Sequence, residues 1–495
     1  MCDKKMAENR EVLLKQEERV YYDEKCPGCK IDKLKQSNPN IPYKHLFYVF
    51  IVALVQDLPI ATLFPFIYFM VRDFHIAKRE EDIGYYAGAI GAAFMCGRFL
   101  TSLVWGMIAD RYGRKPVIIF GTISVLIFNT LFGLSTNFWM ALSMRFLQGA
   151  LCGNLGAVKA YASEICRVEY QALGMSIIST AWGIALVIGP ALGGFLAQPA
   201  EKLPHIFSQE SLFGRFPYFL PCLFISMIAL VITILCFWLP ETLHFHNKVD
   251  EEENEKLCDQ LEVNTNGSDL SLNLQKCEED CQTPQQSLYR NWPLMSSIIV
   301  FCVFQLHDMA YAEIFPLWAV SPKNFGGLGY SSSDVGEALS ISGIGMLIFQ
   351  LFVYPPLERK CGFLPLTRIG AVVTIALLST YPFMAKLSGL SLTLLIDCAS
   401  VMKNIISVSI ATGLFLLQNR VVSQKQRGAA NGIAMAGMSL FKAIGPAGGG
   451  SLFSWALNRQ HASFLPGVHM VFFILNVVEF IALMMTFKPF LDVPQ

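Results

Sequence analysis

Ionisable side chains inside long apolar segments are the residues of this sequence that could do chemistry. Asp57 and Asp308 lie near the middle of two such segments, and Arg145 lies in a third. An arginine within a membrane span costs about 2.5–3.5 kcal/mol on insertion scales, so it should face a partner or a wet cavity. We expect Asp57 to be its partner, because a carboxylate beside an arginine and alternately accessible water can bind and release a proton. The alternative is a static buried ion pair that holds two helices in register.

Further polar residues extend this candidate site. His307 stands beside Asp308 and could titrate near neutral pH, and Asp397 and Asn404 are seven residues apart, so they share one helical face. We therefore predict a proton-coupling or substrate site formed by Asp57, Arg145, His307, Asp308, Asp397 and Asn404. Other ionisable residues in apolar segments are Arg98, Lys159, Glu337, Lys403, Lys442 and Glu479. Three of them lie nearer segment ends and are expected to snorkel to the interface, namely Lys159, Glu337 and Glu479.

The segments that must position these residues are long enough to cross a membrane. Hydrophobic residues make up 53% of the 495 residues and charged residues only 15%, whereas soluble domains carry nearer a quarter charged residues. A span needs about 20 predominantly apolar residues. Twelve such segments are predicted, at residues 46–71, 84–107, 117–134, 138–160, 173–196, 218–239, 294–320, 335–357, 364–384, 390–417, 429–456 and 468–487.

The polar stretches between these segments predict the domain organisation. We expect a cytosolic N-terminal tail at 1–44, a six-helix bundle at 45–240, a cytosolic linker at 241–291, a second six-helix bundle at 292–488 and a cytosolic C-terminal tail at 489–495. The N-terminal stretch has no apolar core typical of a signal peptide, and Lys and Arg gather in the loops assigned to the cytosol. The formal net charge is zero, and no basic patch interleaved with aromatic residues indicates a nucleic-acid partner.

The sequence also repeats itself. The stretch Asp57–Pro65 returns as Asp308–Pro316, and Gly189–Gly194 returns as Gly445–Gly450, in each case about 250 residues later and in the same direction. An even number of predicted spans separates the copies. A parallel duplication of this kind predicts two similar halves with a substrate site between them near the bilayer midplane.

Three motifs then resemble those of major facilitator proteins. The stretch Gly106–Pro116 resembles their Gly-x-x-x-Asp-Arg-x-Gly-Arg-Arg/Lys loop, Arg145–Gly149 resembles the Arg-x-x-x-Gly element of proton-coupled members, and Gly189–Gly194 partly resembles the Gly-Pro element of antiporter branches. The resemblance implies an all-α polytopic membrane protein with twelve transmembrane helices in two pseudo-symmetric six-helix bundles.

Two groups of residues take roles from these motifs. The expected conformational switch loop comprises Gly106, Asp110, Arg111, Gly113 and Arg114. In it we expect Asp110 to bond a neighbouring helix terminus and a basic side chain; the alternative is a loop that only fixes topology. The expected hinge or packing residues are Gly189, Pro190, Gly193, Gly194, Gly445 and Pro446. Helix bending and simple close packing both remain open for them.

At a finer level the chain resembles the plant zinc-induced-facilitator-like branch. The residues that carry this resemblance include Cys26–Cys29, Trp105–Ser135, Tyr161–Cys166, Gly193–Lys202, Ser208–Phe216, Asn291–Ser297 and Gln426–Met435. The resemblance implies a proton-coupled antiporter on the vacuolar or plasma membrane, whose cargo is a metal chelator such as nicotianamine or a phytosiderophore, potassium, or an auxin-like organic acid. A passive uniporter and a non-transporting nutrient receptor on the same fold remain alternatives.

Other chemistry is not indicated. Cys26 and Cys29 have the spacing of half a zinc site, but no second close pair completes it. We interpret them as unliganded thiols in a mobile tail and expect no metal site and no cofactor. His244, His246, Cys258, Cys277 and Cys281 lie in the predicted linker, where a transient metal contact is conceivable. We find no clustered nucleophile and base that would indicate an enzyme and no filter loop that would indicate a channel. A monomer is expected.

Overall fold

Helices form the whole regular structure of the part of the chain that can be described. The computed structural model describes residues 26–37, 40–152, 155–167, 170–243, 290–421 and 427–491, and no strand occurs within these ranges. This agrees with the expected all-α class. Residues 244–289, which include most of the predicted linker and its histidines and cysteines, lie outside the described part.

The helices form two sets in chain order. After α2 (Pro27–Ser37), the first set comprises α3 (Tyr43–Leu63), α4 (Ile67–Asp73), α5 (Ile83–Tyr112), α6 (Arg114–Gly133), α7 (Phe138–Leu151), α8 (Leu155–Ile165), α9 (Gln171–Leu196), α10 (Pro199–Lys202), α11 (Leu212–Arg215) and α12 (Phe219–Cys236). The second comprises α15 (Trp292–Val320), α16 (Ser332–Ile348), α17 (Tyr354–Cys361), α18 (Phe363–Met384), α19 (Leu390–Arg420), α20 (Arg427–Leu457) and α21 (Val468–Met485). We call these sets the first and second halves.

Nine of the described helices are long and apolar enough to cross a membrane, and a tenth results if the bent pair Glu80–Ser102 and Val104–Tyr112 counts as one span. The other two predicted segments contain α7, α8 and α20. The helix α7 has 14 residues and α8 has 11, while α20 is long but carries Lys442 and a run of glycines. The count of twelve spans therefore stays a prediction.

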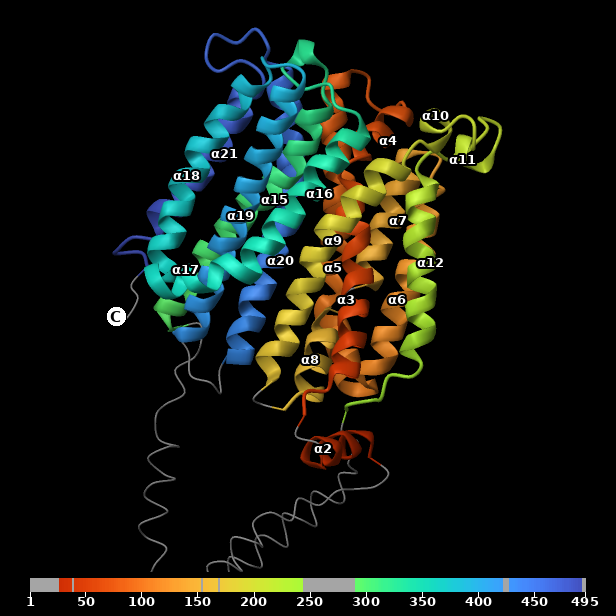
Figure 1. Cartoon of the computed structure of the whole chain (residues 1–495), viewed down its shortest axis with the longest axis vertical. Helices are drawn as coiled ribbons and strands as arrows, with labels where there is room; N and C mark the ends of the chain where they lie inside the picture. The colour runs from red at the N-terminus through yellow and green to blue at the C-terminus, as the bar shows by residue number, and fades with distance from the viewer. Residues whose placement is uncertain are drawn as a thin grey trace, which may run out of the picture.

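The two halves stand side by side with their helices roughly parallel (Figure 1). Helix α5 packs along α20, and α9 packs along α16, so each half contributes two of the four helices at the seam. Helices α4, α10 and α11 lie at one end of the molecule, which we call the outer end, and α2 lies beyond the opposite, inner end (Figure 1).

The glycine-rich motifs lie where helices pack closely together. A Cβ at Gly189 would lie 2.6 Å from Ala61 Cβ of α3, and one at Gly445 would lie 2.7 Å from Met309 Cβ of α15, so each motif packs α9 or α20 onto the first helix of its own half. Further along, a Cβ at Gly194 would lie 2.6 Å from the Ser332 carbonyl oxygen, and one at Gly450 would clash with the Gly84 carbonyl, both across the seam. Close packing is therefore one role of these residues.

Pro190, Pro446 and Gly193 fit the same close packing of helices. Pro190 and Pro446 lie inside the continuous helices α9 and α20. The Pro190 carbonyl lies 2.6 Å from the position of a Cβ at Gly336, and a Cβ at Gly193 would clash with the Thr62 carbonyl. That these helices bend during transport stays a prediction.

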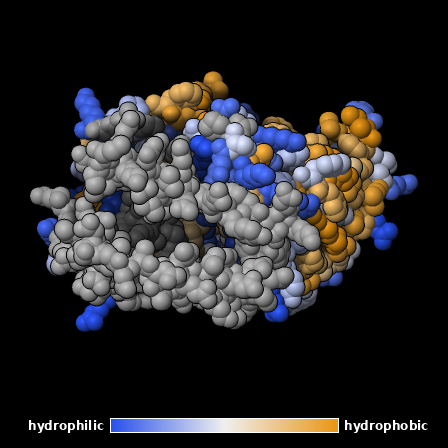
Figure 2. All heavy atoms as spheres, turned by 90° about the horizontal axis from the view of Figure 1, so that it is seen from below, coloured by the Kyte–Doolittle hydropathy of each residue, from blue (hydrophilic) through white to orange (hydrophobic). Residues whose placement is uncertain are grey.

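The lateral surface is apolar. Large hydrophobic side chains are exposed along α12, among them Phe224, Met227, Val231 and Ile234, and Figure 2 shows hydrophobic atoms on the flank where Figure 1 places this helix. Contiguous apolar surface of this kind would be a liability in water. It fits a helix bundle whose flank faces lipid hydrocarbon.

Candidate functional site

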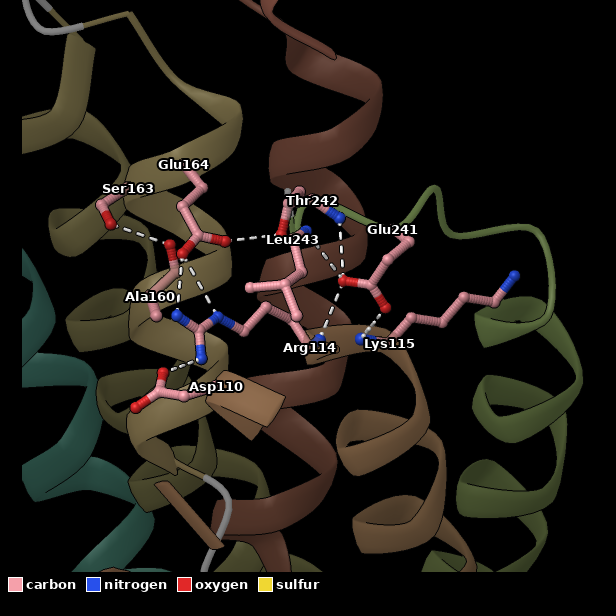
Figure 3. Close-up of polar contacts among 9 residues, drawn as sticks. All are labelled: Asp110, Arg114, Lys115, Ala160, Ser163, Glu164, Glu241, Thr242 and Leu243. Carbon is pink, nitrogen blue, oxygen red and sulfur yellow. Dashed lines mark hydrogen bonds and ion pairs between the residues drawn. The ribbon is translucent and has the colours of Figure 1, made fainter. Parts of the chain in front are cut away.

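The expected switch loop forms a polar network at the inner ends of four helices (Figure 3). The Arg114 side chain, on the first turn of α6, donates from Nε and Nη2 to Glu164 Oε1 on α8, at 3.2 and 3.0 Å. Its third nitrogen pairs with Asp110 on the last turn of α5. Arg114 thereby joins α5, α6 and α8, and it is the basic side chain that Asp110 contacts.

The carboxylate that caps a helix here is Glu241, which the sequence analysis did not single out. Its two oxygens accept hydrogen bonds from the backbone N–H groups of Arg114 and Lys115, at 2.9 and 3.0 Å, and one of them also accepts the N–H groups of Thr242 and Leu243. The N–H groups of Arg114 and Lys115 are free donors at the start of α6, where a negative charge is also stabilised by the helix dipole.

This arrangement corrects the expected role of Asp110. Its side chain is 70% exposed and pairs with Arg114 of the same loop, whereas Glu241, from beyond α12, occupies the helix terminus. Residues 241–243, which the sequence analysis placed at the start of the linker, are thus held on the first half. Thr242 strengthens the attachment, because its hydroxyl donates to Glu164 Oε2 at 2.6 Å.

The other three residues of the expected switch loop have different surroundings. Gly113 has a φ of 109°, and a Cβ there would clash with the Glu241 carboxylate, so glycine is required on both counts. Arg111 is exposed and lies over the Tyr112 ring, 5.6 Å from its centre. A Cβ at Gly106 would meet no atom within 4 Å, so packing does not explain that glycine.

Arg145 of α7 is deeply buried, with 1% of its surface exposed. Its Nη1 donates to Gln148 Oε1 at 3.1 Å and to the Pro59 carbonyl oxygen at 3.4 Å. Its guanidinium lies between the rings of Phe94 and Phe132, at 4.9 and 5.3 Å from their centres. Hydrogen bonding and ring contacts from α3, α5 and α6 thus position this cation.

The expected ion pair between Asp57 and Arg145 is not formed in this structure. Asp57 is 6% exposed, and it lies within electrostatic reach of Arg98, Lys159 and Lys442. The carboxylate within reach of Arg145 is Glu313 of α15, in the other half. The sequence analysis missed Glu313, although an acidic residue in the middle of an apolar segment was the signal that it used elsewhere.

Glu313 lies at the seam between the halves. It is 3% exposed, its Oε1 has no hydrogen-bond partner, and its Oε2 lies 3.1 Å from the position of a Cβ at Gly91 of α5. A buried polar atom without a partner is costly, and such atoms are often found where a site serves a function.

Asp308 and His307 are neighbours in sequence but contact different helices. Asp308 Oδ1 accepts a hydrogen bond from Lys403 Nζ at 2.7 Å and from Ser407 Oγ at 2.6 Å, both on α19. The Lys403 side chain is fully buried, whereas that of Asp308 is 36% exposed. His307 Nδ1 lies 3.0 Å from Glu479 Oε2 on α21, and both side chains are almost completely buried. Glu479 therefore does not snorkel as predicted.

The remaining predicted residues, Asp397 and Asn404, make other contacts. Asp397 lines a cavity of about 270 Å³ at the outer end, together with Lys323, Tyr330, Asp334 and others. It lies about 9 Å along α19 from Lys403 at a rise of 1.5 Å per residue. Asn404 donates to the Ser400 carbonyl oxygen of its own helix at 3.0 Å. Asp397 and Asp308 are thus not brought into one cluster.

A lysine crosses the seam at the outer end. Lys202 of α10 donates to the Gly194 carbonyl oxygen at 2.5 Å and to Ser332 Oγ of the second half at 2.8 Å. Burial lowers the pKa of Lys202 to about 8, against the opposing effect of Glu201 and Asp334. The amine therefore keeps its proton at neutral and acidic pH, where it can make both bonds.

The cysteine pair is not in an exposed tail. Cys26 directly precedes α2 and Cys29 lies in its first turn, and they are 1% and 4% exposed. The Lys35 carbonyl oxygen of this helix accepts a hydrogen bond from Arg167 Nε at 2.8 Å. The interpretation of thiols in a mobile tail is therefore wrong for this segment. No group of three or more His, Cys, Asp or Glu side chains placed to hold a metal ion occurs within the described ranges.

Comparison with known proteins places these features in a family context. Residues 49–416 match the family model described as Major Facilitator Superfamily. The chain is 56% identical to Zinc Induced Facilitator 1 of Arabidopsis thaliana over 98% of this chain and 99% of that protein. It is also 56% identical to Zinc Induced Facilitator-Like 1 of the same plant, over 96% of this chain and 97% of the relative.

Solved structures share the fold. A D-xylose–proton symporter superposes with a TM-score of 0.66 at 15% identity, over 91% of this chain and 98% of the symporter. A bacterial homologue of the lysosomal transporter Spinster superposes with a TM-score of 0.65 at 14% identity, over 90% and 97% of the two chains. At these identities the likeness concerns the fold alone.

Proposed function

Because this chain belongs to the Major Facilitator Superfamily, we propose that it is a proton-coupled antiporter that exports or sequesters a small solute by alternating access. Its fold is the all-α fold of such transporters, and its relatives and structural neighbours are transporters rather than enzymes. The proposed cargo classes are those of the zinc-induced-facilitator-like branch: a metal chelator such as nicotianamine or a phytosiderophore, potassium, or an auxin-like organic acid. We place both termini in the cytosol and the protein, as a monomer, in the vacuolar or plasma membrane.

The observation that carries this proposal is the set of charged groups from both halves at mid-height. Asp57 of α3 and Asp308 of α15 are both within electrostatic reach of Lys442 on α20. The Asp308 side chain is 36% exposed although it lies near the middle of a 29-residue helix. Charged, partly solvated groups at the midplane between two halves are expected where substrate and protons bind in such transporters.

The contacts at the outer and inner ends of the molecule fit an alternating-access mechanism. The outer end is held closed by the glycine contacts at the seam and by Lys202. At the inner end, Arg114, Glu164 and Glu241 tie together helices of the first half alone. We propose that the first half moves as one body about the central charges, while the seam contacts at the outer end form and break.

Flux measurements test this function. The full chain is reconstituted into proteoliposomes, and uptake of each proposed cargo is followed with and without an imposed pH gradient. We expect saturable accumulation that depends on the gradient and is abolished by Asp57→Asn, while Glu210→Gln, in an exposed outer loop, transports normally. Normal accumulation by correctly inserted Asp57→Asn would make Asp57 structural. Flux without dependence on the gradient would indicate a uniporter, and no flux of any cargo would favour a receptor.

A further inference from the structure

Three cationic side chains gather near the middle of the membrane-spanning bundle. Arg98 of α5, Lys159 of α8 and Lys442 of α20 are each within electrostatic reach of the other two and of Asp57 on α3. Helix α20 belongs to the second half and the other helices to the first. Groups from four helices and both halves can approach one another in this way only in the interior, so the cluster lies between the halves.

The protein covers the cluster only in part. Each of the three cations is partly exposed rather than buried. Because α5 packs along α20 and against α8, neighbouring helices separate part of this exposed surface from the lipid. The prediction that Lys159 snorkels to the interface does not fit its neighbours, since Arg98, Lys442 and Asp57 all lie within its reach.

The positive charge in this cluster is not balanced by the protein. Within the described ranges, none of the three cations has a carboxylate within 4.0 Å, and Nη2 of Arg98 is buried without a hydrogen-bond partner. Asp308, the other acidic residue within reach of Lys442, is already engaged by Lys403 and Ser407. Three cations thus share the single carboxylate of Asp57.

Such an excess of like charge is unfavourable inside a protein. Two unit charges 4 Å apart interact by about 4 kcal/mol at an effective dielectric constant of 20, and a guanidinium cannot relieve this by losing its proton. A bound anion would relieve it and would also supply the missing acceptor for Arg98.

The surroundings indicate that the anion has a carbon frame. Lys442 Nζ lies 5.6 Å from the centre of the Trp182 ring on α9. Trp182 packs against a buried apolar cluster drawn from both halves, consisting of Ile60, Phe94, Met95 and Met309. Binding sites for small molecules combine apolar walls of this kind with a few polar groups that fix orientation.

We propose that Arg98, Lys159 and Lys442 bind the carboxylate groups of the transported solute, which is an organic anion or zwitterion carrying two or more carboxylates, with Trp182 against its carbon frame. This inference rests on the proposed transport function and narrows the cargo within it. It excludes free potassium as the solute bound at these residues.

Binding to the full chain in phosphatidylcholine nanodiscs tests the assignment. The probes are acetate, succinate and citrate, with one, two and three carboxylates, and triethyl citrate, which has none; the readout is tryptophan fluorescence and thermophoresis. We expect affinity to rise with the number of carboxylates and triethyl citrate not to bind. Arg98→Gln and Lys442→Gln should each weaken citrate binding by about tenfold or more. Lys442→Arg should bind within a few-fold of the wild type, and so should Lys386→Gln, a matched control outside the cluster.

Two results would overturn the assignment. One is equal binding of citrate and its ester, or citrate affinity that the glutamine variants leave unchanged while their melting temperatures stay normal. The other is a loss of citrate binding when phosphatidylglycerol is added to the nanodiscs, which would show that a lipid headgroup takes the site.

Flux measurements separate this inference from the proposed function. If the variants weaken citrate binding but no solute is transported, the anion site stands and the proposed transport function is refuted. If gradient-driven flux occurs and the variants do not affect it, transport stands and the anion site is refuted.

Discussion

Arg145 shows how a single cation can be held in the interior by shape as well as charge. Its guanidinium plane lies between two aromatic rings and donates toward a glutamine and a backbone carbonyl. A guanidinium can stack on rings and keep a fixed fork of donors, whereas an ammonium is a compact point charge.

We therefore expect Arg145→Lys to reduce pH-gradient-driven flux by at least about tenfold, although the charge is retained. Arg72→Lys is the matched control, because Arg72 also lies over a phenylalanine ring but is exposed at the outer end. Flux by both variants is compared at equal amounts of inserted protein. If the two variants transport equally well, the ring contacts of Arg145 have no special role.

The Asp308–Lys403 pair allows a test of residue coupling. Removing one partner of a fully buried ion pair costs about 3–5 kcal/mol, and a smaller cost is expected here because Asp308 is 36% exposed. We expect Asp308→Asn and Lys403→Met each to lower the melting temperature, and the double variant to recover most of the loss. Transport should not recover if Asp308 takes part in it. Additive losses in the double variant would show that the two side chains do not stabilise each other.

Sequence reasoning at this scale found charged positions but not their partners. A charge in the middle of an apolar segment is visible in the sequence, and Asp308 and Arg145 were identified in this way. Lys403 lies 95 residues from Asp308, and Glu241 lies 127 residues from Arg114. Such pairings depend on which helices become neighbours, and no local pattern encodes that.

Among the structural elements, the start of α6 is contacted by two acidic residues, Asp110 and Glu241. We expect their substitutions to have different effects. Asp110 is exposed, and Arg114 keeps its two bonds to Glu164 without it. We expect Asp110→Ala to slow turnover while cargo affinity stays within a few-fold, because the loop lies at the inner end. Glu241→Gln should lower the melting temperature more than Asp110→Ala, because it removes the charge that accepts four backbone N–H groups. A large loss of cargo affinity in well-folded Asp110→Ala would contradict this placement.

The helix α20 offers a matched pair of glycines for testing the seam. A Cβ at Gly450 would clash with the Gly84 carbonyl of α5, whereas one at Gly448 would meet no atom within 4 Å. We expect Gly450→Ala to lower both the melting temperature and the transport rate, and Gly448→Ala to leave both unchanged. Equal behaviour of the two variants would show that the closure of the outer end does not depend on this contact.

For the molecule as a whole, the cysteine pair tests whether the N-terminal segment belongs to the transport path. Cys26 and Cys29 lie at the start of the α2 segment, beyond the inner end of the bundle (Figure 1), whereas the central charges lie at mid-height. We expect the Cys26→Ser, Cys29→Ser double variant to keep its cargo flux in purified vesicles. A complete loss of flux with correctly inserted protein would make the thiol pair part of the path.

The fold of the whole molecule was more predictable than its site. Long apolar segments and the repeat at about 250 residues predicted an all-helical chain with two related sets of helices, because the bilayer requires each span to satisfy its own backbone. The break between α3 and α4 was not predicted. In a packed interior neighbouring helices can satisfy the freed backbone groups, so hydropathy alone does not report such breaks.

The cap that Glu241 places on α6 also has a consequence for the order in which the protein is made. During synthesis, Arg114 leaves the ribosome 127 residues before Glu241, so the start of α6 receives its cap only when the chain that follows α12 has been made. Until then the first N–H groups of α6 have no carboxylate. The first half can therefore complete its inner face only when its last helix has been made. A chain that ends before Glu241 would contain every helix of the first half but would lack the carboxylate that caps α6.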